Sequence, residues 1–209
     1  MEWMGTTKAG RRERIMPRIK SFLKPFHRHS APGSSPGTVM VREGEPKPVI
    51  SVLAYSDGHL VDEVVDSVEG LDKLTKDHQV TWINIEGLGD AQMIYRLGEM
   101  FGLHWLALED VVNVHQRPKV EDYEGHLFIV ARMVEADPEL QTEQICFFVG
   151  PKFLLTFQEG KPGDCLDPVR QRIRNCTGRI RYRGTDYLTY ALLDSIIDHY
   201  FPVVEAYGE

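Results

Sequence analysis

Hydrophobic positions change their spacing several times along the chain, and each change marks an expected element. Two runs rich in β-branched residues, 49–55 and 60–65, flank an Asp-Gly pair, which is a typical hairpin signal. The run 80–85 predicts a third strand. After Asp90, a candidate N-cap, apolar residues recur at helical spacing as far as Gly102, so a helix is expected between these two residues.

The second half repeats this alternation of helix and strand patterns. A short helix is expected over 104–114, followed by a polar turn over 115–119. Further strands are expected at 126–134, 143–149 and 153–157, a helix from Asp167-Pro168, and a long last helix from Thr185 to Val204 or beyond. Two groups of strands with helices between and after them predict an α/β fold, a three-layer α/β/α sandwich with a mixed sheet between helix layers.

The first 38 residues do not share these patterns. Basic residues alternate there with Pro and Gly, so we expect a disordered basic tail over 1–38 and a globular domain over 39–209. Residues 11–26 form a short basic amphipathic stretch that would suit an anionic membrane surface. An unstructured extension without a role in the fold is the alternative.

Composition narrows the class of protein. A chain of 209 residues that is 42% hydrophobic can bury the core of one domain, and it contains no apolar run of membrane-spanning length. We therefore expect the chain as given to be soluble. Its three cysteines have no C-x-x-C spacing, which argues against a disulfide framework and a structural zinc site and favours a reducing cytoplasm.

Charge is divided unevenly along the chain. Residues 1–36 carry eight Lys and Arg against two acids, a net +6, which leaves −13 for the remainder of a chain whose total is −7. A strongly acidic domain argues against nucleic acid as a partner, because such binding depends on neutralising phosphates. The same charge is compatible with attracting cations.

Motifs for catalysis are absent from the sequence. It contains no Walker A loop, no G-x-G-x-x-G after a strand, no H-E-x-x-H and no G-x-S-x-G. His104, His115 and His126 recur at intervals of eleven, but a turn and a strand start separate them, so they do not share one face. We therefore expect no catalytic or cofactor-binding residues and no enzyme.

Two sets of carboxylates are the candidate cation ligands. Glu109 and Asp110 are adjacent on the helix expected over 104–114, and such oxygen ligands suit Mg²⁺ or Ca²⁺. On the last helix, Asp194 and Asp198 continue a row of polar residues four apart that begins at Asp186. Like charges at this spacing cost an isolated helix about 0.2–0.5 kcal/mol per pair, so a cation or other positive charge would relieve them.

A simpler interpretation of each set stays open. Glu109 and Asp110 would then simply face water, as most charged side chains do. The acids of the last helix would be balanced by the six arginines between residues 170 and 183.

Several longer runs together resemble one family. They are LALEDVVNVHQRPKVEDYEGHLFIVARM, EQICFFVG, FLLTFQEG, DPVRQRIR and DYLTYALLDSIIDHYF. In this order and spacing they resemble the cytosolic N-terminal domain of CorA-type magnesium and cobalt transport proteins. The resemblance covers roughly residues 80–201, with a weaker match over 49–80.

The resemblance implies a function in ion transport. It implies a homopentamer in the inner membrane, with this domain at the cytoplasmic face, a long stalk helix that our last helix would begin, and two membrane helices. Mg²⁺, or Co²⁺, bound between neighbouring domains would sense the internal ion concentration and hold the pore closed. Carried over by position, Glu109, Asp110 and Asp194 would be regulatory metal ligands, and Asp198 is a further candidate because it lies one turn from Asp194.

The chain departs from this family at its end. It stops at Glu209, before the rest of the stalk, the membrane helices and the selectivity loop, so we expect a truncated chain that cannot transport ions by itself and that is a monomer or weak oligomer. One alternative is the zinc-transporting branch of the same superfamily, although adjacent carboxylates favour a harder cation. Another is a stand-alone soluble metal-dependent regulator or enzyme.

Overall fold

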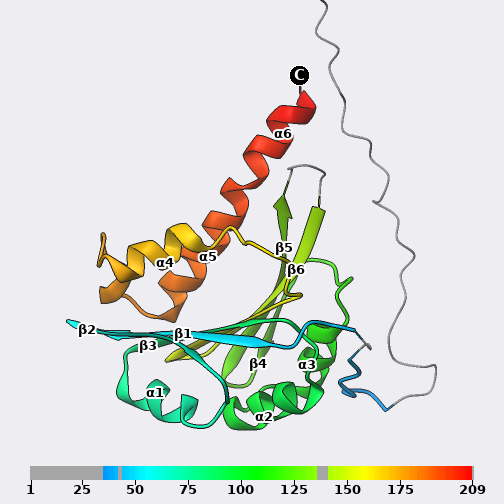
Figure 1. Cartoon of the computed structure of the whole chain (residues 1–209), viewed down its shortest axis with the longest axis horizontal. Helices are drawn as coiled ribbons and strands as arrows, with labels where there is room; N and C mark the ends of the chain where they lie inside the picture. Colours follow the sequence, from blue (N-terminus) through cyan, green and yellow to red (C-terminus); the bar gives the residue numbers. More distant parts are fainter. Residues whose placement is uncertain (1–34, 42–43, 136–140, 209) are drawn as a thin grey trace, which may run out of the picture.

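A single mixed sheet of seven strands forms the centre of the molecule (Figure 1). The structure is a computed structural model of the chain and describes residues 35–41, 44–135 and 141–208. The strand order is β2-β1-β3-β7-β6-β5-β4, and β3 pairs with β7 in parallel while the other pairs are antiparallel. The strands are β1 (Val49–Ser56), β2 (His59–Val65), β3 (Val80–Glu86), β4 (Lys119–Tyr123), β5 (His126–Glu135), β6 (Gln141–Val149) and β7 (Phe153–Gln158).

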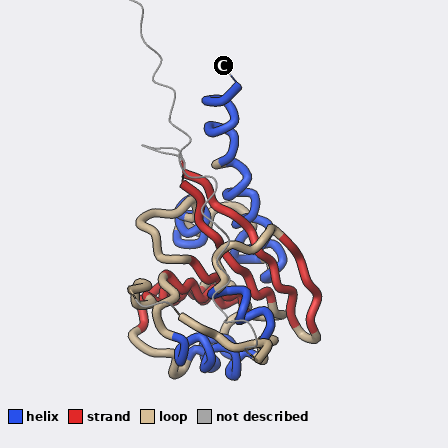
Figure 2. The backbone as a smooth tube through the Cα atoms, turned by 90° about the vertical axis from the view of Figure 1, so that its right-hand side faces the viewer, coloured by secondary structure: helices blue, strands red, loops and turns tan. Residues whose placement is uncertain are grey.

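Helices cover both faces of this sheet. On one face lie α1 (Leu71–Asp77), α2 (Ala91–Phe101) and α3 (Trp105–Val112). On the other lie α4 (Asp167–Arg174), the short 3-10 helix η1 (Ile180–Tyr182) and α5 (Thr185–Asp198), while α6 (Tyr200–Gly208) extends beyond the sheet (Figures 1 and 2). The expected three-layer α/β/α sandwich with a mixed sheet is confirmed.

The central strands are apolar on both sides because both sides are covered. In β6, Cys146 and Phe148 pack into the cluster under α2 and α3, whereas Ile145 and Phe147 pack under α4 and α5. This alternation follows from the period of two along a strand. It produces the continuous apolar run typical of a strand with both faces buried.

The local signals at the first hairpin and at α2 are confirmed. Ser56 pairs with His59, so Asp57 and Gly58 alone form the turn, and Gly58 has a φ of 77°. Asp90 caps α2 because its carboxylate accepts a hydrogen bond from the Met93 N–H at 3.0 Å. Gly102 ends α2 in the left-handed conformation, with a φ of 64°.

The last helix differs from the prediction. A single helix was expected from Thr185 to Val204 or beyond, but α5 ends at Asp198 and α6 begins at Tyr200. Pro202 accounts for the interruption, because proline has no N–H to donate back to the carbonyl of Asp198. The backbone bond from His199 N–H to Ser195 O is already long there, at 3.4 Å.

Three further elements were absent from the prediction. The segment after the expected polar turn contains β4, an edge strand, and α1 and η1 were not expected. Within the described ranges, no helix is both long and apolar enough to cross a bilayer. Of the tail expected over 1–38, only residues 35–38 are described, so its expected disorder and the amphipathic stretch 11–26 lie outside the described residues.

Candidate functional site

Glu109 is buried at the contact between α3 and the start of the described chain. The residue is 9% exposed, and its Oε2 accepts a hydrogen bond from the Gly37 N–H at 2.8 Å. Gly37 has a φ of 81°, and a Cβ added there would lie 2.9 Å from the Cβ of Trp105. Glycine is therefore required at the position that brings its N–H to the Glu109 carboxylate.

Asp110 is held by an ion pair within the same chain. Its two carboxylate oxygens accept hydrogen bonds from Lys119 Nζ at 2.6 Å and Gln116 Nε2 at 2.8 Å. Lys119 also binds Glu121 at 2.8 Å. Desolvation disfavours the charged form of Lys119, but the bonds to these two carboxylates outweigh it and raise its pKa. One ammonium group thus bridges carboxylates from α3 and from edge strand β4.

Asp194 and Asp198 are exposed on α5. Of the six arginines expected to balance them, Arg170 and Arg174 form ion pairs in the described part of the chain, and these pairs go to Asp62, Glu86, Asp164 and Asp167. None of these acids lies on α5. The simpler interpretation of the sequence, in which neighbouring arginines balance the acids of α5, is therefore not supported by the ion pairs of the described residues.

The structure does not bring the four candidate ligands together in one chain. Glu109 and Asp110 lie in the helix layer on one face of the sheet, and Asp194 and Asp198 lie in the layer on the other (Figure 1). Across the described residues, no group of three or more His, Cys, Asp or Glu is arranged to hold a metal ion. The carboxylates are chemically suited to a hard cation, but an ion bound by both sets would have to lie between copies of the chain.

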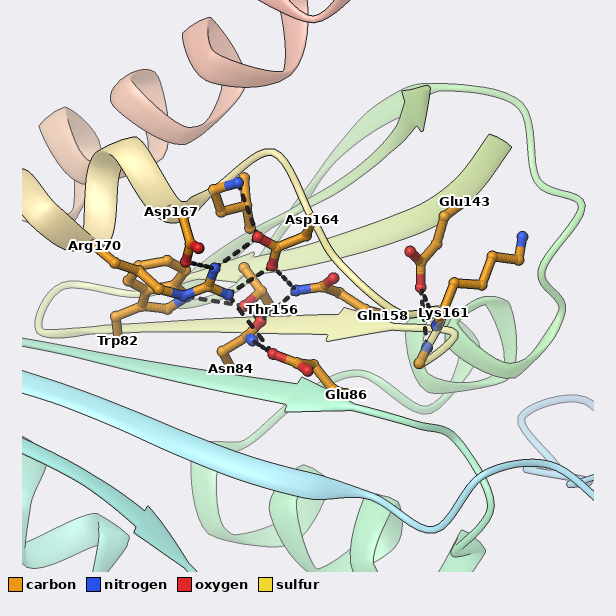
Figure 3. A network of polar contacts seen from close by, with 12 residues as sticks. Trp82, Asn84, Glu86, Glu143, Thr156, Gln158, Lys161, Asp164, Asp167 and Arg170 are labelled. Carbon is orange, nitrogen blue, oxygen red and sulfur yellow. Dashed lines mark hydrogen bonds and ion pairs between the residues drawn. The ribbon is translucent and has the colours of Figure 1, made fainter. Parts of the chain in front are cut away.

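A buried polar network was not predicted from the sequence. Arg170 donates to both carboxylate oxygens of Asp164 at 2.6 Å and to Asp167 at 2.9 Å, and its guanidinium lies 5.3 Å from the ring centre of Trp82 (Figure 3). Burial alone would raise the pKa of Asp164, but the bidentate bonds from Arg170 outweigh it and lower this pKa.

The network continues into the sheet through uncharged side chains. Gln158 donates to Asp164 at 3.1 Å and to Asn84 Oδ1 at 2.8 Å, and Thr156 donates to the same Asn84 oxygen at 2.6 Å. The polar network therefore joins the carboxyl ends of parallel strands β3 and β7 to the segment before α4. The sequence did contain a signal for this network, namely polar residues inside otherwise apolar strands. A buried polar group needs a hydrogen-bond partner, so these residues indicate a buried network.

Comparison with known proteins places the chain in one family. Residues 77–209 match the family model described as "CorA-like Mg2+ transporter protein". The chain belongs to this family. Membership of a family of transporters agrees with the expectation that the chain is not an enzyme.

Particular relatives support the assignment. The chain is 43% identical over 159 residues to the cobalt/magnesium transport protein CorA of Thermotoga maritima, covering 75% of this chain and 45% of that protein. It is 33% identical over 124 residues to the putative metal ion transporter YfjQ of Bacillus subtilis, covering 59% of this chain and 37% of that protein. The chain thus spans less than half the length of these curated relatives.

Solved structures show the same fold at low sequence identity. The soluble domain of CorA from Methanocaldococcus jannaschii has a TM-score of 0.58 at 19% identity, covering 75% of this chain and 58% of that one. The cytoplasmic domain of ZntB from Vibrio parahaemolyticus has a TM-score of 0.55 at 13% identity, covering 75% and 62%.

Proposed function

We propose that this chain is the ion-sensing domain of a CorA-type transporter of divalent cations, Mg²⁺ and Co²⁺, at the cytoplasmic face of the cell membrane. In this proposal the complete protein is a homopentamer, and Mg²⁺ bound between neighbouring copies stabilises the closed state. The observation that carries the proposal is the location of the acidic pair Glu109–Asp110 in one helix layer and of Asp194 and Asp198 in the opposite layer. Family membership supports it.

The local charges are consistent with a site completed by a second copy. Lys119 already neutralises Asp110 inside the chain, so a cation at the interface has to compete with an ammonium group for that carboxylate. Asp194 and Asp198 are exposed and free of ion pairs with the described arginines. Bringing such acids close to the pair on another copy creates repulsion, and a divalent ion turns that repulsion into a bridge.

The chemistry of the four candidate ligands also favours Mg²⁺ over Zn²⁺. All four candidate ligands are carboxylates, which are preferred by hard cations, whereas zinc sites commonly use His and Cys. The structural similarity to the ZntB domain concerns the fold alone. We therefore expect Mg²⁺ to act on this chain more strongly than Zn²⁺.

The proposal is tested by following the melting temperature of the chain during titration with Mg²⁺, Co²⁺ and Zn²⁺ at increasing protein concentration. A ligand that binds the folded state raises the melting temperature with concentration. Mg²⁺ should raise it in the wild type and less in Asp110→Asn and Asp194→Asn. Asp186→Asn, which removes an exposed acid from the same helix, is the matched control and should respond like the wild type.

Two results would contradict the assignment. One is an equal Mg²⁺ response in all these variants, which would mean that the ion binds elsewhere. The other is no response at the highest protein concentration reached, where an interface site would be formed.

A further inference from the structure

A cavity of about 170 Å³ lies beside the junction between α5 and α6. It is bounded by the paired ends of β5 and β6, by the segment between β7 and α4, and by His199 at the end of α5. None of the four candidate metal ligands lines it. Its walls combine apolar and charged side chains, among them Met133, Val134, Glu143, Lys161, Asp164 and Cys165.

Glu143 is the buried charged group of this cavity. Only 6% of the residue is exposed. Its Oε1 accepts hydrogen bonds from the Gly160 N–H at 3.0 Å and the Lys161 N–H at 3.3 Å (Figure 3). Within the described residues, its second carboxylate oxygen has no hydrogen-bond partner. Among the described residues, this oxygen is not one of the fully buried polar atoms that lack a partner, so it is still reached by solvent. A ligand in the cavity that donates a hydrogen bond can replace water there.

The cations near Glu143 are engaged with other groups. Lys161 Nζ donates to Thr142 O at 2.5 Å and pairs with Glu159 at 3.0 Å. Asp164 is neutralised by Arg170. The remaining titratable groups that line the cavity are Glu135 on β5, the thiol of Cys165, whose pKa burial raises, and His199, whose Nδ1 lies 2.9 Å from Ser195 O. When Glu143 is ionised, the groups that line the cavity carry more negative than positive charge, which favours a positively charged ligand.

The size and the remaining walls narrow the choice of cation. Met133, Val134 and Cys165 supply apolar surface, and a cavity of about 150 Å³ is known to hold a molecule the size of benzene. A metal ion is a poor match, because these side chains do not form a group of three ligands in the described structure. A compact organic cation with a short apolar part satisfies both the carboxylate and the apolar walls.

We propose that this cavity binds a small organic cation, a primary ammonium group on a short alkyl chain. The ammonium donates a hydrogen bond to the free oxygen of Glu143, and the chain packs against Met133 and Cys165. This site is separate from the proposed inter-subunit metal site.

The protonation of Glu143 supports this arrangement and makes it measurable. Burial raises the pKa of Glu143 to about 7, partly opposed by its backbone hydrogen bonds and by Lys161 and increased by Glu159. A bound ammonium favours the ionised carboxylate, so binding near neutral pH releases protons. Affinity should therefore increase with pH up to about 7 and level off above it.

The probe for the test is n-butylammonium, with n-butanol as the neutral molecule of similar size. Isothermal titration at pH 8 measures affinity, and the methyl resonance of Met133 reports whether the probe enters the cavity. We expect n-butylammonium to bind with a Kd of about 1 mM and n-butanol at least about tenfold more weakly, since a charged hydrogen bond contributes roughly that factor or more. Glu143→Gln should lose this preference for the cation.

The wild-type protein alone provides a second test. Its affinity for n-butylammonium should be at least about tenfold lower at pH 5.5 than at pH 8, because Glu143 is then mostly protonated. Equal affinities at the two pH values, equal binding of amine and alcohol, or an unchanged Met133 resonance would each overturn the proposal. This result does not depend on the folding of any variant or on the response to Mg²⁺.

Discussion

Arg170 illustrates how single side chains organise the interior. Its side chain is 11% exposed and that of Asp164 is 6% exposed, so their ion pair is largely shielded from water. Arg174, one turn further along α4, forms a comparable pair with Asp62 at the surface, where the two side chains are 37% and 38% exposed. The two pairs differ in burial and also in their surroundings, since Arg170 additionally binds Asp167 and lies over the ring of Trp82.

Replacing Arg170 should be far more costly than replacing Arg174. Arg170→Met leaves the Asp164 carboxylate buried without its partner, which we expect to lower the free energy of unfolding by about 3–5 kcal/mol. Arg174→Met should cost less than about 1 kcal/mol. Urea denaturation at pH 7 measures both, and similar losses in the two variants would show that the buried setting of Arg170 adds nothing to the energy of its pair.

The pH dependence of the same pair has a definite sign. Arg170 lowers the pKa of Asp164 in the folded state, so its stabilisation is present above the ordinary carboxyl pKa and is lost as pH falls through the folded value. The difference between wild type and Arg170→Met should therefore shrink in strong acid.

Glu143 should make the pH dependence of stability run in the opposite direction. Its pKa is raised from 4.5 to about 7, so the folded state holds its proton more tightly than the unfolded state. Stability from this group is present below the unfolded pKa and is lost as pH rises to about 7. Between pH 4.5 and pH 8, we expect Glu143→Gln to gain up to about 3 kcal/mol relative to wild type. Urea denaturation at the two pH values checks this, and a constant difference would contradict it.

At the scale of elements, the sequence predicted helix ends and turns correctly at positions where a single residue type, such as a capping Asp or a Gly with positive φ, determines the backbone conformation. Asp90 and Gly102 limit α2, and an Asp-Gly pair closes the first hairpin. Strand β4 was not predicted because it is an edge strand whose side chains are mostly charged, so the apolar alternation is weak. The break between α5 and α6 could have been predicted from Pro202, but the apolar periodicity on both sides concealed it.

The turn between β3 and α2 depends on a close backbone contact. Gly89 donates its N–H to Pro46 O at 2.8 Å, and a Cβ there would lie 2.5 Å from the carbonyl oxygens of Glu45 and Pro46. Backbone atoms cannot move aside as a flexible side chain can. The segment before β1 is thus packed directly onto the turn that positions α2.

Gly89→Ala should therefore destabilise the chain by about 2 kcal/mol or more, because the turn and the segment 45–47 must separate. Gly184→Ala is the control: its added Cβ would meet only Asp186 Oδ1, the end of a side chain that can rotate, and the cost should stay below about 1 kcal/mol. Thermal unfolding of the two variants provides the comparison. Equal shifts would mean that the close backbone contact is unimportant.

At the scale of the whole molecule, the sequence predicted the class of fold and the family better than the geometry of the site. The layers follow from the alternation of strands and helices, which is a property of neighbouring residues. The partners of Glu109 and Asp194 depend on contacts between distant segments or between copies, and hydrophobic patterning carries no information about them. Gly37 and Glu109 are 72 residues apart. The assignment of Glu109 and Asp110 as metal ligands stays a prediction, and their hydrogen-bond and ion-pair partners within the chain were not predicted.

The arrangement of the acids in opposite layers leads to a prediction about assembly. In the absence of divalent cations, repulsion between the acidic faces should keep this chain a monomer or weak oligomer. Added Mg²⁺ should increase its average mass at high protein concentration, and Asp110→Asn should reduce that increase. Light scattering measures the mass, and a stable pentamer at micromolar concentration without divalent cations would contradict the prediction.

The hydrogen bond between Gly37 and Glu109 has a thermodynamic consequence for the beginning of the chain. If a cation draws the Glu109 carboxylate away from the Gly37 N–H, the free energy of that bond is subtracted from the free energy of ion binding. This linkage is reciprocal. The factor by which a bound ion weakens the attachment of residues 35–39 to α3 equals the factor by which that attachment weakens ion binding. The attachment of residues 35–39 to α3 is thereby thermodynamically linked to any ion that binds the Glu109 carboxylate.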